Sequence, residues 1–149
     1  MTTDSPGDWR DLNRQLNAEQ IEEIEASELD DELRLSWARR LATSNLLQAR
    51  FADVPAPTEC AEEPWPWEDN EDGRYGRLFS VSSRIVIPGA DGMTGAVGVG
   101  GQQFSDGTVQ RWVETSGPMI DAMTADQARD VAAALLAAAD ELDRLNKQD

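Results

Sequence analysis

An alanine-rich helix over residues 124–145 is the feature that most constrains what this chain can fold into. Thr124 and Gln127 form a capping box, in which the Thr124 hydroxyl accepts from the Gln127 amide and the Gln127 side chain reaches back to the cap. Downstream, apolar residues recur at alternating steps of three and four, which predicts one buried face. That face comprises Ala128, Val131, Leu135, Ala138, Leu142 and Leu145.

The residues before this helix predict a sheet for it to cover. Apolar and polar residues alternate in 77–87, valines continue the pattern in 94–104 and 108–114, and an Asp-Gly pair indicates a hairpin between the last two segments. Residues 77–149 therefore predict a β-β-β-α unit. The expected fold class is α+β, with a small antiparallel sheet of two to three strands packed on a long C-terminal helix.

The middle strand of this predicted sheet is unusually rich in glycine. Glycine weakens a strand unless another element must approach it closely. We therefore expect the glycines to admit the alanines of the helix at short range. The glycines concerned are Gly95, Gly98, Gly100 and Gly101.

Residues 1–53 predict a helical segment in three parts. Asp8 caps a short helix, Asn17 opens a second one with another capping box, and a third runs from near Asp30 or Asp31 to about Ala52. The apolar sector of the third helix is broad, so this helix either packs on two sides or offers a surface to a partner. The candidate partner-binding residues on it are Leu33, Trp37, Leu41 and Phe51.

Residues 54–76 predict an acidic linker or extended arm. Four prolines interrupt regular structure, and acidic residues accumulate with no basic residue before Arg74. Trp65-Pro-Trp67 is unexpected in so charged a stretch. Two interpretations are open: the indoles pack back onto the sheet or the third helix, or Trp65 and Trp67 anchor another protein, since tryptophan is enriched at interface hot spots.

The charge of the chain is strongly negative and unevenly spread. The chain has 29 acidic and 13 basic side chains, a net charge of -16, and residues 1–76 alone carry -12. Such a surface repels nucleic-acid phosphates and anionic membranes. We therefore expect no direct nucleic-acid binding and no membrane partner. The same charge disfavours a DNA-reading helix-turn-helix built on Arg34, Arg39 and Arg40.

The residues that most catalytic and metal sites require are missing. The chain has no histidine, and Cys60 stands among carboxylates that oppose thiolate formation. The glycine run lies within a predicted strand rather than at the head of a helix, which disfavours phosphate binding. Residues 68–73 echo a calcium loop, but Phe79 stands where the bidentate glutamate belongs, so we interpret them as an acidic turn. We expect no enzyme, no cofactor and no metal.

The cellular compartment is predicted from what the sequence lacks. One cysteine excludes an intramolecular disulfide scaffold, the first residues do not resemble a signal peptide, and no apolar run approaches the length needed to span a bilayer. We expect a cytoplasmic protein.

Several short stretches together resemble small acidic, uncharacterised proteins of mycobacteria and their phages and prophages. They are DWRDL at 8–12, LNAEQI at 16–21, ADVP at 52–55, FSDGT at 104–108, and MTADQAR at 123–129 before an alanine helix. The likeness covers most of the chain, and its tail is the most specific part. It implies an accessory protein of phage or prophage type, and it implies no functional residue.

The leading functional hypothesis is a noncatalytic protein that binds a host or phage protein through its helical front half and its Trp-Pro-Trp arm. The alternative is an acidic nucleic-acid mimic that inhibits a DNA- or RNA-binding host enzyme, which predicts salt-sensitive binding to a basic protein. An enzyme that relies on carboxylates alone ranks last. The broad apolar sector of the third helix also leaves a homodimer open.

Overall fold

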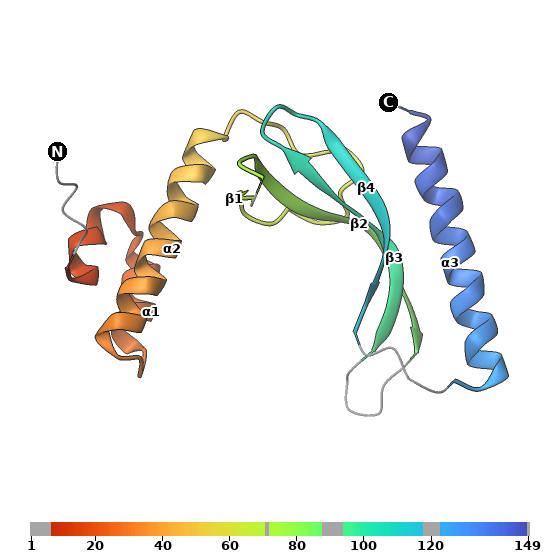
Figure 1. Cartoon of the computed structure of the whole chain (residues 1–149), viewed down its shortest axis with the longest axis horizontal. Helices are drawn as coiled ribbons and strands as arrows, with labels where there is room; N and C mark the ends of the chain where they lie inside the picture. Colours follow the sequence, from red (N-terminus) through yellow and green to blue (C-terminus); the bar gives the residue numbers. More distant parts are fainter. Residues whose placement is uncertain (1–6, 71, 88–93, 118–122, 149) are drawn as a thin grey trace. The chain divides into compact units, whose positions relative to one another are not determined.

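The computed structural model describes residues 7–70, 72–87, 94–117 and 123–148, and Figure 1 shows their secondary structure. These residues form two units, one comprising the residues up to Asp53 with Pro66–Glu68 and the other comprising Val54–Trp65 with the residues from Asp69 onward. The elements in chain order are η1 (Trp9–Gln15), α1 (Ala18–Ala26), α2 (Asp31–Arg50), β1 (Glu68–Asp69), β2 (Tyr75–Ile87), β3 (Gly95–Phe104), β4 (Val109–Ser116) and α3 (Ala125–Asn146). The α+β class is confirmed.

The first unit is built on three capped helices. Asp8, Asn17 and Asp30 are the N-caps of η1, α1 and α2, and each accepts a backbone N–H from the first turn of its helix. The core between these helices buries Trp9, Leu12, Ile24 and Ala38, and Leu16, Ile21, Leu35, Trp37 and Leu41 pack partly against it.

The sheet of the second unit has the order β1-β2-β3-β4, with β3 antiparallel to both β2 and β4. The Asp-Gly hairpin is confirmed: Gly107 has a φ of +88°, and the Thr108 amide donates to Asp106 Oδ1 at 2.9 Å. The prediction of two to three strands is wrong by one. The additional strand, β1, comes from residues predicted as linker, where prolines and acids gave no strand pattern.

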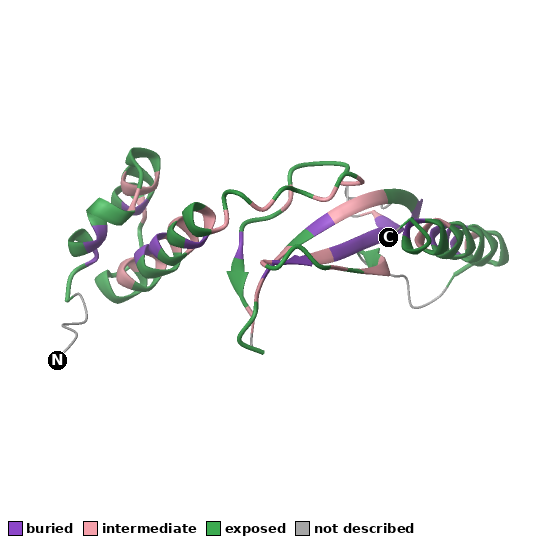
Figure 2. Ribbon diagram, turned by 90° about the horizontal axis from the view of Figure 1, so that it is seen from above, coloured by how far each residue is buried: buried purple, intermediate pink, exposed green. Residues whose placement is uncertain are grey.

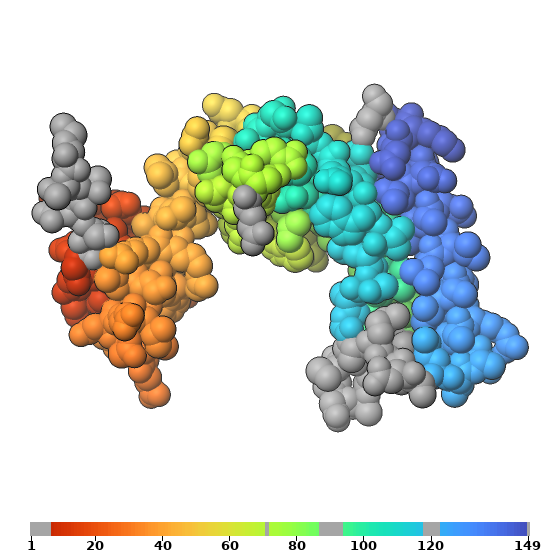
Figure 3. All heavy atoms as spheres, viewed as in Figure 1, coloured from red at the N-terminus to blue at the C-terminus, as the bar shows by residue number. Residues whose placement is uncertain are grey.

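The helix α3 covers one face of this sheet (Figures 1 and 3). Its predicted capping box is present, since Gln127 N–H donates to Thr124 Oγ1 at 3.2 Å and Thr124 N–H to Gln127 Oε1 at 3.0 Å. The buried residues of α3 lie on the side toward the strands (Figure 2). Ala128 and Leu135 are exceptions to the predicted stripe, because both are exposed, Leu135 by 39%. The shared core comprises Val86, Val97, Val99, Val131, Ala134, Ala138 and Leu145.

The expected matching of strand glycines with helix alanines is wrong for the three glycines that can be checked. Val97 and Val99 face α3, so Gly98 and Gly100, one residue away, face the opposite side. A Cβ at Gly98 would meet the carbonyl oxygen of Ser82, which sits in a β-bulge of β2. A Cβ at Gly100 would meet the Glu114 carboxylate, and one at Gly101 would lie 2.6 Å from the Phe79 ring. Glycine here makes room for neighbouring strands.

A proline-containing segment covers the remainder of the valine face. Residues two apart on a strand share a face, so Gln103 continues the face of Val99 beyond the reach of the apolar core. Gln103 is buried and donates to the Pro55 carbonyl at 2.8 Å, while Arg77 donates to the Val54 carbonyl at 3.1 Å. Side-chain donors therefore hold a chain segment in which prolines cannot supply backbone donors.

An ion pair completes this attachment. Arg111 of β4 donates to Glu59 Oε1 from Nε at 2.8 Å and from Nη2 at 2.6 Å. The two side chains are only 6% and 14% exposed. Water screens such a pair little. Removal of either side chain would therefore leave a buried charge without its partner.

Residues 61–65, which follow Glu59 in the sequence, lie along the edge of β2. Ala61 and Trp65 donate their amides to the carbonyls of Ser80 and Leu78, each at 2.9 Å. In an extended chain, alternate amides point to opposite sides. The amide of Trp65 points to β2, so the amides of its two neighbours would point away from it. Those neighbours are Pro64 and Pro66, which have no amide hydrogen to donate. This arrangement blunts the outer edge against further strand pairing.

We predict that Gly98→Ala destabilises the protein, although alanine is ordinarily the better strand residue. The new methyl group would press on the Ser82 carbonyl, and overpacking of this kind costs about 1–3 kcal/mol. Urea unfolding followed by circular dichroism measures the change. Gly7→Ala is the control, because a Cβ there meets nothing within 4 Å. Equal stability of the two variants would contradict the proposed role of the bulge.

We predict strong coupling between Glu59 and Arg111. Arg111→Met leaves a carboxylate in a site with little water, which costs on the order of 3 kcal/mol, and Glu59→Leu leaves the guanidinium in the same position. The double variant should lose less stability than the two single losses combined. Simple additivity in a double-mutant cycle of urea midpoints would show that the pair does not hold the segment.

Candidate partner-binding surface

The structure separates the residues that the sequence proposed for partner binding. Leu33 is 51% exposed, and Trp37 and Leu41 are half-buried against the helical core. The two tryptophans of the arm differ: Trp65 is 60% exposed, whereas Trp67 is 2% exposed. Trp67 thus packs back onto the protein, whereas Trp65 is exposed, and its role as an anchor for another protein stays a prediction.

Trp67 packs within the first unit against the C-terminal end of α2. Its ring centroid lies 5.2 Å from that of Phe51, with the planes tilted by 51°. Gln48 Nε2 donates to the Trp67 carbonyl at 3.5 Å. Trp67 and Phe51 therefore contribute to folding in this structure, and neither indole nor phenyl ring is presented as an open anchor.

Leu33 and Trp37 instead lie together in a shallow depression of about 400 Å³ on the first unit. Leu29, Ser36 and Arg40 complete its lining. Leu29 is 39% exposed. Sequence reasoning missed Leu29 because it precedes the helix cap and so falls outside the periodic pattern of α2. Its spacing of four residues from Leu33 was the available signal.

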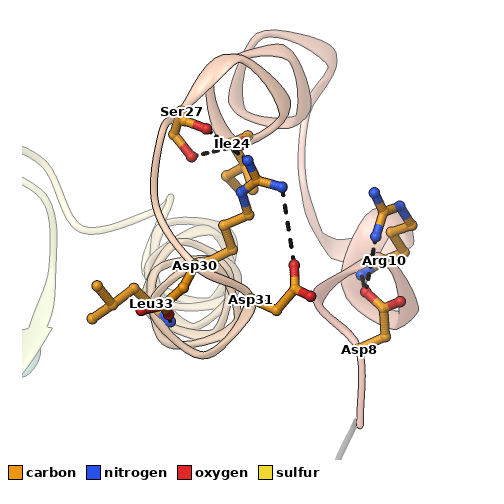
Figure 4. Close-up of polar contacts among 8 residues, drawn as sticks. Asp8, Arg10, Ile24, Ser27, Asp30, Asp31 and Leu33 are labelled. Carbon is orange, nitrogen blue, oxygen red and sulfur yellow. Dashed lines mark hydrogen bonds and ion pairs between the residues drawn. The ribbon is translucent and has the colours of Figure 1, made fainter.

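Polar contacts hold the turn between α1 and α2, from which Leu29 joins the lining (Figure 4). Asp30 caps α2 by accepting the Leu33 amide at 2.9 Å, and Arg34 Nη2 donates to the Ser27 carbonyl at 2.6 Å. Arg34 also lies 4.0 Å from Asp31. The Leu33 side chain points away from this polar network (Figure 4). Polar contacts on one side of the turn thus leave an apolar side chain in water on the other.

The sequence that leads into the depression is acidic. Eight acidic residues and no basic residue occur between Glu19 and Glu32, whereas Arg40 stands at the other end of the lining. Asp30 and Asp31 are engaged in the cap and with Arg34. The remaining acids are exposed and are Glu19, Glu22, Glu23, Glu25, Glu28 and Glu32.

Other exposed apolar side chains are scattered. In the second unit they include Leu78, Ile85 and, on α3, Leu136, which are 38%, 60% and 69% exposed. In the first unit, Leu46 is 66% exposed and borders a smaller hollow of about 220 Å³ with Gln15, Ala42 and Asn45. Single exposed leucines are ordinary on protein surfaces, so the grouping at Leu29, Leu33 and Trp37 is the distinctive feature.

The acidic turn after β1 is closed by its own basic residue. Arg74 Nε donates to Asp72 Oδ2 at 2.7 Å, and this hydrogen bond lowers the pKa of Asp72 below its usual range. Glu71, which belongs to the same turn, lies outside the described residues. Within the part of the chain that the structure describes, no three His, Cys, Asp or Glu side chains gather as a metal site would require. None of the described helices combines the length and apolarity needed to cross a bilayer.

Cys60 lies half-buried beside the Glu59 and Arg111 pair. Burial, followed by the negative charge of Glu59, raises the pKa of its thiol above the usual range, and Arg77 opposes this rise. A raised pKa keeps the thiol protonated at neutral pH, when it is a weak nucleophile.

Comparisons with protein-family models, with curated proteins and with solved structures find no match to this chain. The inference of function therefore rests on the surface described above.

We predict that Cys60 reacts slowly with iodoacetamide near neutral pH. Since the folded-state pKa is raised, the thiolate fraction at pH 8 should be smaller than that of the same cysteine in the urea-unfolded chain, and the rate should rise toward a higher pH. Rates measured by mass spectrometry from pH 7 to 10 test this. A folded-state rate profile with its midpoint below that of the unfolded chain would contradict it.

Proposed function

We propose that this chain is a noncatalytic accessory protein that binds another protein through the depression on α2. One observation carries the proposal: Leu29 and Leu33 stand exposed together beside Trp37, while the helical core of the same unit closes without these two leucines. Tryptophan and arginine are the side chains enriched at interface hot spots, and Trp37 and Arg40 both line this depression.

The role of the Trp-Pro-Trp arm changes in this proposal. Trp67 holds the arm on α2, and Trp65 is the tryptophan that remains accessible. Trp65 offers a second contact for a partner. The proposal further includes the phage or prophage type of accessory protein that the resemblance implies, and a cytoplasmic location, for which the single cysteine is the argument.

A nucleic-acid mimic is the second candidate. The exposed acids between Glu19 and Glu32 favour it, because they form a stretch with no basic residue. A mimic would bind through charge alone, so its affinity would fall steeply with salt and would not depend on the leucines. This difference separates the two candidates.

We predict that Leu33→Asp strongly weakens capture of the partner, while Leu46→Asp does not. Both leucines are exposed residues of α2, so each variant places the same charge on the same helix at little cost in stability. The chain is used as bait in a mycobacterial lysate, and captured proteins are quantified by mass spectrometry. A central interface residue contributes about 2 kcal/mol, so capture should fall more than tenfold.

The outcomes distinguish the candidates. A protein that is lost with Leu33→Asp and kept with Leu46→Asp supports docking at the depression. A protein that both variants retain, and that high salt releases, supports the mimic. Recovery of no protein above a resin control would count against both.

A further inference from the structure

We propose that the depression on α2 takes a basic amphipathic helix of the partner protein. An apolar side chain of that helix sits among Leu29, Leu33 and Trp37, and its Lys and Arg side chains lie over the exposed acids of the turn before α2 and of the head of α2. This inference rests on the proposed function and specifies the chemistry of the partner.

The geometry of the lining suits a helix. Leu33, Trp37 and Arg40 follow one another at steps of four and three residues, so they form a row on one side of α2. Seven residues of helix extend about 10 Å, or two turns. A partner helix places residues at i, i+3, i+4 and i+7 along the same length, which is how amphipathic helices bind apolar grooves.

The same side of α2 already binds an apolar side chain within the protein. Phe51 follows Leu33 by 18 residues, which is five turns at 3.6 residues per turn, so both lie on one side of the helix. At the Phe51 end, this side buries Trp67. At the Leu33 end, Leu29 and Leu33 are exposed, and the half-buried Trp37 lies beside them. The intramolecular contact shows what this side of the helix accepts, namely a large apolar group.

Charge selects a basic partner over a second copy of this chain. Glu28 and Glu32 flank Leu29 and Leu33 in the sequence and are exposed, and four further exposed glutamates lie on α1. At physiological salt, charges interact over roughly 8 Å, so basic side chains flanking an anchored helix fall within reach. In two copies docked through this surface, Arg40 of each copy would be the one basic residue of the described lining against the glutamates of the other, so most of these glutamates would stay unneutralised.

Arg40 gives the docked helix a direction. It lines the end of the depression away from the acids. A partner helix that is basic along the acids and carries a carboxylate near Arg40 satisfies both ends. The reverse orientation places like charges together at both ends.

Three synthetic peptides of equal length test the inference with the full chain. The basic probe has leucine at i, i+3, i+4 and i+7 with lysine and arginine elsewhere, and the neutral probe replaces its basic residues by glutamine. The scrambled probe keeps the composition of the basic probe and loses its apolar face. Binding is measured by fluorescence anisotropy at 50, 150 and 500 mM salt, with circular dichroism to confirm that each variant is folded.

The matched variants are Leu33→Asp, Leu46→Asp and the double variant Glu28→Gln with Glu32→Gln. For the basic probe at 150 mM salt, we expect at least a tenfold loss with Leu33→Asp and less than a twofold change with Leu46→Asp. The double glutamine variant should bind several-fold more weakly and show a smaller salt dependence. Because Leu33→Asp adds a negative charge, a loss of basic peptide there cannot be electrostatic.

Each remaining outcome overturns a defined part of the account. If the neutral probe binds as tightly as the basic probe and still requires Leu33, the basic class is wrong and the docking function stands. If the scrambled probe binds as well as the basic one, or no binding depends on Leu33, both the inference and the docking function fail. A dimer in light scattering that Leu33→Asp dissociates would identify a second copy as the occupant and overturn the inference.

Discussion

Burial of the valine face of β3 is the constraint on which the second unit depends. Val97 and Val99 present this face, and α3 covers it with the small and branched side chains that pack closely on a sheet. Further along the same strand the face becomes polar at Gln103, where an apolar helix would leave a buried amide unpaired. The segment that begins at Val54 takes over at that point, because its carbonyls accept from Gln103 and Arg77. The helix α3 thus covers the apolar part of this face, and the segment from Val54 covers its polar part.

In the first unit, polar contacts hold a turn between two helices. Asp30 and Arg34 fix the turn between α1 and α2, and the helical core closes around Trp9 and Ile24. Neither arrangement requires Leu33 to be buried. An exposed leucine on a rigid, capped helix is already in position for a partner, so binding there requires little ordering of the chain. The proposed function therefore depends on an exposed leucine that the fold of this unit does not need.

The sequence predicted those parts of the fold that depend on near neighbours. The capping boxes at Asn17 and Thr124 and the Asp-Gly hairpin were predictable because each is set within about four residues. The attachment of the proline segment was not, since it depends on donors such as Gln103 and Arg111, which are far away in sequence. The need for glycine at position 98, beside the Ser82 carbonyl, likewise arises from a bulge, which alternation does not reveal.

The candidate surface was predictable only in part. Helical periodicity placed Leu33 and Trp37 on one side of α2, as the structure has them, but it also grouped Phe51 with them as a binding residue. Trp67 covers Phe51, and a contact between residues 16 positions apart through a proline-rich loop leaves no periodic signal. Leu29 escaped notice because it belongs to the turn.

The most direct test of this account is a methyl NMR spectrum of the chain with labelled leucines, recorded before and after addition of a basic amphipathic helical peptide. The account predicts that the methyl signals of Leu29 and Leu33 shift on binding, while those of Leu46 and of Leu136 on α3 stay in place. Shifts confined to Leu46 or Leu136, or a peptide that binds without moving the signals of Leu29 and Leu33, would contradict it.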